Sequence, residues 1–265
     1  MKKVASMRYG VVFKKAFCDP EIFAAFAQDF LGVKLEISHV ETEKSFDPAV
    51  GYVKPRFDLF AEDKKNRVIV DIQHERSGDH YDRFLYYHCE ALLEQIAHSS
   101  NYRPRFKVFT IVVLTSGDRH GEDILVTDFD PKTKEGKGIG EIPHKIIYLC
   151  PKYANGSKSD PRNEWLKAIQ DTLDEEVDES SYERSEILKM FGHIRKDEIS
   201  PEERAQMIDE YNQEELRQQA YKEGEMTGAL KIARALLAQG MTLEAVIGAT
   251  GVKKEDLLSL PSNET

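Results

Sequence analysis

Two aspartates in a predicted β-hairpin are the strongest candidates for chemistry in this 265-residue chain. Residues 56–75 read RFDLFAEDKKNRVIVDIQHE, in which two runs of apolar and β-branched residues flank a polar tip. A loop of two or four residues, symmetric about Lys64 and Lys65, places Asp58 directly opposite Asp71. Opposed Cβ atoms lie roughly 4.5–5.5 Å apart, and two carboxylates at about 5 Å repel by roughly 3 kcal/mol at an effective dielectric near 20. Folding alone does not favour this pair, whereas a divalent cation would bind both carboxylates.

Alternation along the second strand adds polar groups to the same face. Strand side chains return to one face every two residues, so Asp71, Gln73 and Glu75 share a face while Ile72 points the other way. Asp58 is expected on the polar face. Hard oxygen ligands on a strand pair suit Mg²⁺ or Mn²⁺ better than zinc. The alternative is a half-exposed hairpin whose polar face simply meets water.

The spacing of Asp58, Asp71 and Gln73 is that of a nuclease metal site. In such a site two carboxylates and one backbone carbonyl, here that of Ile72, hold a metal that polarises the scissile phosphate and lowers the pKa of a bound water. The residue two positions after the second acid normally carries a positive charge that stabilises developing negative charge. Gln73 occupies this position and can position a water by hydrogen bonds, but it supplies no charge. We therefore expect a slower enzyme, or one more dependent on its metal.

Composition limits the class of protein. The chain is 40% apolar and 32% charged, as expected for a globular protein with highly charged segments, and no apolar stretch approaches the roughly 18–20 residues that span a bilayer. A net charge of −10 argues against a surface coated for nucleic-acid binding, but it leaves a local basic groove open. Three distant cysteines offer neither a disulfide framework nor a zinc spacing. The amino terminus is a poor signal peptide, and we expect a cytoplasmic protein with no membrane segment.

The apolar patterns predict a mixed sheet with helices on its faces, because a hairpin is followed by a helical crossover. The long helix of this crossover should bury a stripe of Leu85, Cys89, Leu92 and Ile96. The helices are predicted at residues 9–17, 19–31 and 79–98, and the strands at 35–40, 56–61, 67–74, 106–114, 123–129 and 144–149.

The chain should divide into three regions. Residues 1–160 hold all the predicted strands, residues 161–200 are a helical and strongly acidic linker, and residues 201–265 form an α-helical tail. Gly240 and Gly251 separate short helices in this tail, as in a helix-turn-helix unit. Acidic side chains begin its last helix, where DNA-reading helices carry donors. We therefore expect the tail to serve self-association or regulation more than DNA reading.

These segments, in this order, resemble the PD-(D/E)XK nuclease superfamily, and more narrowly the Rpn-type recombination-promoting nucleases, also labelled putative transposases. The hairpin is similar to that family's acid and (D/E)xQ element, HYDRFLYYHCEALLEQI to its following helix, and YGVVFKKAF to its amino-terminal box. The acidic linker and the tail are similar to its usual ending. The match covers most of the chain.

The resemblance implies a restriction-endonuclease-like α/β fold with an αβββαβ core, and a Mg²⁺- or Mn²⁺-dependent endonuclease that acts on DNA. It also implies a role in recombination, in a mobile element or in defence. The residues that it implies are catalytic Asp58, Asp71 and Gln73, metal-binding Asp58, Asp71 and Ile72, and substrate-binding Arg83, Tyr87 and Gln95. Assembly into a homo-oligomer through the helical tail is a further expectation.

Two positions depart from the family's pattern. The second acid is often Glu in this group and is Asp71 here, and the amino-terminal box often has an acid where this chain has Gly10. The second hypothesis is therefore a catalytically weak or inactive nuclease fold that serves as a binding or assembly module. Full transposition activity ranks last, because no further acid triad is present. Arg83 is the best candidate for a phosphate contact, with an ion pair to Asp79 or Glu90 as its alternative.

Overall fold

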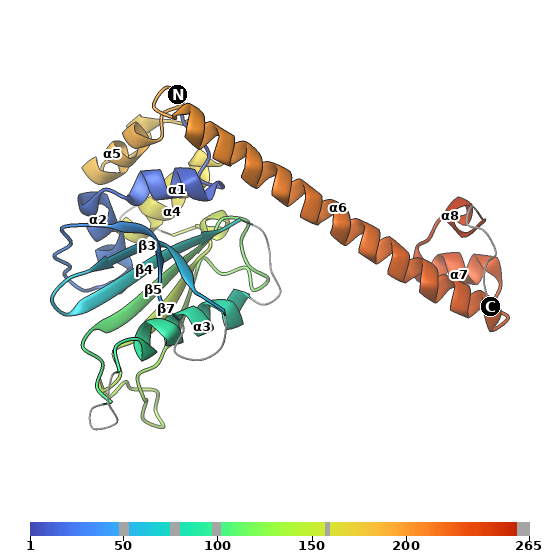
Figure 1. Cartoon of the computed structure of the whole chain (residues 1–265), viewed down its shortest axis with the longest axis horizontal. Coiled ribbons are helices and arrows are strands. Elements are labelled where there is room, and N and C mark those ends of the chain that lie inside the picture. Colours follow the sequence, from blue (N-terminus) through green and yellow to red (C-terminus); the bar gives the residue numbers. More distant parts are fainter. Residues whose placement is uncertain (48–52, 75–79, 97–101, 157–159, 259–265) are drawn as a thin grey trace. The chain divides into compact units, whose positions relative to one another are not determined.

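A six-stranded mixed sheet forms the centre of the first of two units, Met1–Met207 (Figure 1). The structure is a computed structural model that describes residues 1–47, 53–74, 80–96, 102–156 and 160–258. The strand order is β2-β3-β4-β5-β7-β6. The β4–β5 and β5–β7 pairs are parallel, and the β2–β3, β3–β4 and β6–β7 pairs are antiparallel. The strands are β2 (Glu41–Ser45), β3 (Arg56–Glu62), β4 (Asn66–Gln73), β5 (Lys107–Leu114), β6 (Ile124–Asp128) and β7 (Lys145–Leu149).

Helices cover both faces of this sheet (Figure 1). The helix α3 (His80–Leu93) connects β4 to the parallel strand β5 and packs on one face. Four other helices pack on the opposite face: α1 (Gly10–Phe17), α2 (Pro20–Leu31), α4 (Pro161–Thr172) and α5 (Ser185–His193). Two single-turn helices, η1 (Pro151–Tyr153) and η2 (Glu179–Ser181), and a small ladder of β1 (Lys2–Lys3) with β8 (Glu176–Val177) complete the unit. The mixed sheet flanked by helices and the αβββαβ order are confirmed.

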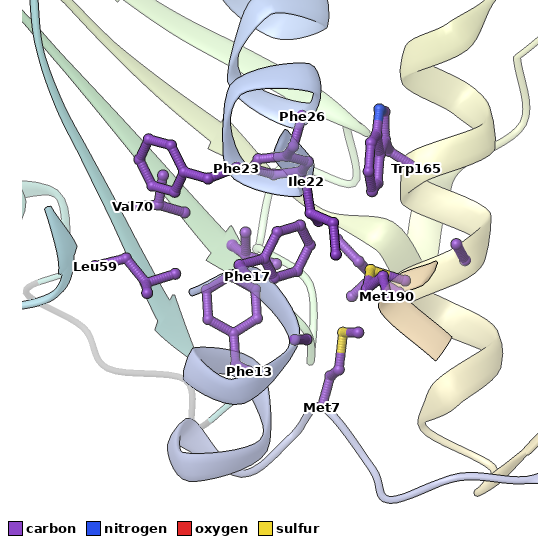
Figure 2. Packing of buried hydrophobic residues seen from close by; sticks show 14 of the residues in the cluster. Met7, Phe13, Phe17, Ile22, Phe23, Phe26, Leu59, Val70, Trp165 and Met190 are labelled. Carbon is purple, nitrogen blue, oxygen red and sulfur yellow. The ribbon is translucent and has the colours of Figure 1, made fainter. Parts of the chain in front are cut away.

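The larger core lies between the sheet and the four-helix layer. Aromatic side chains dominate it, with Phe17 in contact with Phe26 and Trp165 at centroid separations of 4.8 and 6.0 Å. Leu59 and Val70 of the hairpin strands belong to the same cluster, and Figure 2 shows the Phe23 ring beside Val70. Fully buried apolar residues therefore pack against the face of the hairpin that is turned toward the four-helix layer. A precise site requires rigid support of this kind.

The predicted helix at 19–31 begins and ends as expected. The Asp19 carboxylate accepts hydrogen bonds from the backbone N–H groups of Glu21 and Ile22, at 2.9 and 3.3 Å. Gly32 ends the helix in the left-handed conformation, at φ 65°, which glycine adopts without a Cβ penalty.

The prediction of a strand at 35–40 is wrong, because these residues form no strand. The backbone N–H of Leu35 donates to the Gln28 side chain at 2.8 Å, and that of Glu36 donates to the Asp63 side chain at 3.3 Å. Backbone donors that bind side chains in this way are not available to a strand ladder. The strand at this edge of the sheet is instead β2, which follows directly.

The apolar stripe predicted for α3 is also wrong. Leu85 is 40% exposed, and the helix buries Phe84, His88 and Ala91, at positions i, i+4 and i+7. A polar residue belongs to this buried face because His88 Nδ1 hydrogen-bonds Thr110 Oγ1 of β5 at 2.9 Å. The helix also ends at Leu93 and not near His98.

Residues 161–200, predicted to be a linker, contribute directly to the core of the first unit. Trp165 of α4 is fully buried and donates from Nε1 to the Asp29 carboxylate of α2 at 2.8 Å. Met190 of α5 is fully buried, and Lys189 pairs with Asp19 at 2.9 Å. The acidic composition of this region therefore lies on the outer faces of elements whose inner faces are apolar.

In the second unit, Ile208–Thr265, the described residues form helices as predicted. A small cluster of Ala233, Val246 and Val252 unites the end of α6 with the two short helices that follow. The Thr242 hydroxyl caps the second helix by accepting from Ala245 N at 3.3 Å, and Gly251 ends it at φ 68°. The helices are α6 (Pro201–Ala238), α7 (Leu243–Thr250) and α8 (Lys254–Leu258). Among the described residues, no helix has both the length and the apolar character needed to cross a membrane.

Candidate active site

The hairpin of β3 and β4 has the predicted register. Leu59 pairs with Val70 and Glu62 with Arg67, and one further step along the same register sets Asp58 opposite Asp71. The face assignment also holds, because Val70 belongs to the core under the four-helix layer and Ile72 packs against that core. Ile69, two residues before Asp71, contacts α3 residues on the other face.

The two carboxylates replace ladder hydrogen bonds where the pairing of β3 with β4 ends. Asp58 N donates to Asp71 Oδ1 at 2.9 Å, and Ile72 N donates to Asp58 Oδ2 at 3.0 Å. Each aspartate thus binds the backbone of the opposite strand. Backbone carbonyls alternate in direction along a strand, and the Gln73 carbonyl accepts from Thr115 N on the β5 side. The Ile72 carbonyl is therefore directed to the opposite side, where Asp58 lies.

Asp71 is buried and lacks a full set of partners. Its exposed fraction is 4%, and its Oδ2 is a buried atom with no hydrogen-bond partner among the described residues. Burial raises the pKa of Asp71 well above its ordinary value, and the nearby Asp58 charge raises it further. The hydrogen bond from Asp58 N and the charge of Arg83 oppose this rise in pKa. A hairpin face that simply meets water does not describe Asp71, because α3 covers this face of the sheet.

Gln73 is held by a side chain from α3. Arg83 Nη2 donates to Gln73 Oε1 at 2.6 Å, and the Arg83 guanidinium lies 4.6 Å from the centroid of the Phe84 ring. The Arg83 Nε is buried without a hydrogen-bond partner in the described part of the chain. Asp79, one of the alternative partners predicted for Arg83, lies outside the described residues. No pattern in the sequence indicated the contact between Arg83 and Gln73.

Tyr87 lies one helical turn beyond Arg83 and faces the same site. Its ring meets Phe57 edge-on at a centroid separation of 5.8 Å. Burial raises the pKa of Tyr87, the Arg83 charge lowers it, and the charges of Asp71 and Asp58 raise it. The Tyr87 hydroxyl is thus within electrostatic reach of both aspartates.

Gln95 lies elsewhere, at the opposite end of the hairpin. Its Nε2 donates to Ala91 O at 2.9 Å and its Oε1 accepts from Phe106 N at 2.7 Å, so both ends of the amide support the turn after α3. It lines a pocket together with Asp63 and Lys64 of the hairpin tip. The structure therefore does not bring Gln95 to the aspartate pair.

The residues present fit a hard cation with a small protein ligand set. Among the described residues, no group of three or more His, Cys, Asp or Glu side chains could hold a metal. Glu75 lies outside them, and Gly10 begins α1 without a side chain to contribute. Mg²⁺ keeps several waters and commonly binds through one or two carboxylates with substrate phosphates. The unpartnered Asp71 Oδ2, the facing Asp58 carboxylate and the Ile72 carbonyl suit such an ion.

Comparison with known proteins gives one match. A family model described as PD-(D/E)XK nuclease family transposase matches residues 11–225. The six-stranded mixed sheet flanked by helices, with a long carboxy-terminal helix, fits a restriction-endonuclease-like α/β fold. No curated protein and no solved structure matches the chain.

Proposed function

The chain belongs to the PD-(D/E)XK nuclease family of transposases, and from this premise we propose that it is a metal-dependent endonuclease that hydrolyses phosphodiester bonds in DNA. A bound Mg²⁺ or Mn²⁺ would polarise the scissile phosphate and lower the pKa of a coordinated water. Asp58, Asp71 and the Ile72 carbonyl would hold the ion, and Gln73 would orient the attacking water by hydrogen bonds. Tyr87 borders the same site on α3 and would meet the substrate there, and Arg83 of the same helix hydrogen-bonds Gln73 beside it.

One observation carries the proposal. Two aspartates meet at the end of a strand pair, and one of them is buried with an oxygen that no described residue binds. A buried carboxylate beside a second carboxylate is unfavourable unless a cation or a proton compensates it. The family supplies the chemistry in which such a pair holds a divalent cation.

Cleavage of supercoiled plasmid with Mg²⁺ tests the assignment. The wild type should nick or linearise the plasmid, and Asp71→Asn should reduce the rate by at least roughly 100-fold, because the metal loses a charged ligand. Asp209→Asn, at an exposed acid of α6, removes the same charge from a residue outside the proposed ligand set and should cut like the wild type. Equal cleavage by the wild type and Asp71→Asn would refute the assignment.

A second candidate function is a binding or assembly module with a nuclease fold. It is supported by the small ligand set, two carboxylates among the described residues, together with the uncharged Gln73. Calorimetric titration with Mg²⁺ separates the two candidates. Absence of binding at millimolar metal favours the module, and binding that disappears in Asp71→Asn favours the enzyme.

We further propose that the protein acts in DNA recombination, in a mobile element or in defence, and that it self-associates through the helical tail. Ile208, Leu216 and Tyr221 of α6 are each at least 60% exposed, and a second copy of the chain could bury such apolar side chains. Sedimentation velocity of the full chain over a range of concentrations tests this proposal. A single monomeric species at every concentration contradicts it.

A further inference from the structure

The contact between Arg83 and Gln73 provides positive charge at a position where the strand itself has none. This inference rests on the proposed nuclease function. Arg83 Nη2 lies 2.6 Å from Gln73 Oε1, and a hydrogen bond with a charged donor is shorter and stronger than one between neutral groups. It joins the third residue of the D-I-Q motif on β4 to the first turns of α3.

The chemistry of the two side chains fixes the orientation of the Gln73 amide. A guanidinium has only donors, whereas a primary amide has one acceptor oxygen and one donor nitrogen. Only Oε1 can face Arg83, so the Gln73 NH₂ group is directed away from the guanidinium. Donation from a cation also polarises the amide and strengthens its NH₂ as a donor. An amide that rotates freely would present oxygen and nitrogen without preference.

We propose that Arg83 is a positioning residue that fixes Gln73 as a water-orienting donor and supplies the positive charge that a side chain at position 73 would otherwise carry. Arg83 then acts through Gln73 and not as a direct clamp on a substrate phosphate. The guanidinium is bonded to the residue two positions after Asp71, on the same face of β4, so its charge lies beside the aspartate pair. Gln73 on β4 and Arg83 on α3 together thus supply the donor and the positive charge that a single charged residue at position 73 would supply.

Arg83→Gln tests the proposal while preserving the fold. Glutamine can still donate one hydrogen bond to Gln73 Oε1, so α3 stays joined to β4 while the charge is lost. We expect kcat for plasmid cleavage to fall by roughly 10- to 100-fold, with KM for DNA within about twofold of the wild type. Arg83→Lys keeps charge and donor and should restore most of kcat. Arg162→Gln removes an exposed charge from α4, which packs on the opposite face of the sheet, and should cut like the wild type.

The double variant Gln73→Lys/Arg83→Gln moves the charge onto the strand. We expect it to cut roughly tenfold faster than Arg83→Gln or better, because the charge is restored at the position next to Asp71. Gln73→Lys alone places two cations within hydrogen-bond distance and should gain less than the double variant does. A double variant no faster than Arg83→Gln overturns the proposal, and so does an Arg83→Gln variant with unchanged kcat and a raised KM, which would identify a substrate contact.

Metal binding gives a readout that does not depend on turnover. Removing a cation near Asp71 should let Arg83→Gln bind Mg²⁺ more tightly, on the order of fivefold by calorimetry, and Gln73→Lys/Arg83→Gln should reverse the gain. If the contact only holds α3 in place, Arg83→Gln should instead bind Mg²⁺ more weakly.

The nuclease assignment and the role of Arg83 can fail separately. The nuclease assignment fails if the wild type does not cut with Mg²⁺ or Mn²⁺, or cuts no faster than Asp71→Asn. The proposal that Arg83 positions Gln73 fails, while the nuclease assignment stands, if the wild type cuts and Asp71→Asn does not, yet Arg83→Gln retains the wild-type kcat.

Discussion

At the scale of single residues, Asp71 is arranged for ligand binding at the expense of stability. Its folded pKa is raised above the ordinary value of 3.8, so its carboxyl favours folding below pH 3.8, and this contribution is lost as pH rises through the folded pKa. In the absence of metal, ionisation of Asp71 beside Asp58 is therefore destabilising. Natural sites often retain such a cost where function requires it.

Asp71→Asn should accordingly stabilise the metal-free protein. The asparagine oxygen can still accept from Asp58 N, while the buried charge and its repulsion by Asp58 disappear. We expect the free energy of unfolding at neutral pH, measured with urea in the presence of EDTA, to rise on the order of 1–3 kcal/mol. Asp209→Asn serves as the charge-matched control and should change it little. A clear loss of stability in Asp71→Asn would show that the carboxylate is compensated within the protein itself.

The sequence could predict the aspartate pair but not its surroundings. A symmetric hairpin fixes which residues face each other, so the register of Asp58 and Asp71 follows from the chain alone. The contact of Arg83 with Gln73 depends on how α3 lies across the sheet, which is decided by the packing of Phe84, His88 and Ala91. Gln95 was assigned to the site by resemblance, and it lies away from it because α3 ends at Leu93 and the chain turns there.

At the scale of elements, the packing of α3 against β5 depends on a neutral histidine. His88 is fully buried, hydrogen-bonds Thr110 Oγ1 at 2.9 Å and stacks on Phe129 at a centroid separation of 5.1 Å. Burial, helped by the neighbouring His144, lowers the pKa of His88 from 6.5 to about 3. The neutral His88 therefore stabilises the fold above pH 6.5, and this stability is lost as pH falls toward 3.

The loss should be visible in the pH dependence of unfolding. Between pH 6.5 and 4 the contribution of His88 should fall by up to about 1.4 kcal/mol per pH unit, because only the unfolded state takes up a proton there. His88→Gln retains a hydrogen-bonding side chain and does not titrate, so its free energy of unfolding should depend less steeply on pH in this range. Urea unfolding of both proteins at several pH values measures the difference. Identical slopes would mean that His88 is protonated in the folded protein.

Element boundaries follow from sequence where local chemistry sets them. The Asp19 cap and the Gly32 stop directly flank the helix that they limit, and both were predictable. The segment from Leu35 to Val40 alternates like a strand, but its first two amides donate to side chains of residues that the fold brings near. The buried face of α3 was missed because periodicity counts apolar residues, and His88 occupies that face through a bond to a strand that is distant in sequence.

At the scale of the whole molecule, composition did not reveal which segments belong to the core. The region after residue 160 is strongly acidic, yet it supplies Trp165 and Met190 to the cluster that supports the hairpin (Figure 2). A few large apolar residues are sufficient, because each buried side chain contributes about 1.5–3 kcal/mol. The stability of the site and the stability of the first unit are therefore joined through one core.

Metal binding should consequently stabilise the whole first unit by mass action. At a Mg²⁺ concentration 100 times its Kd the gain is about 2.7 kcal/mol, which corresponds to a rise in Tm of roughly 5–10 °C for a unit of this size. The gain should increase as pH rises through the folded pKa of Asp71, since Mg²⁺ binds the deprotonated carboxylate and competes with its proton. Thermal unfolding with Mg²⁺, and with NaCl at matched ionic strength, measures this effect. Asp71→Asn should lose the Mg²⁺-specific shift at every pH, and a shift of equal size in that variant would place the ion outside the aspartate pair.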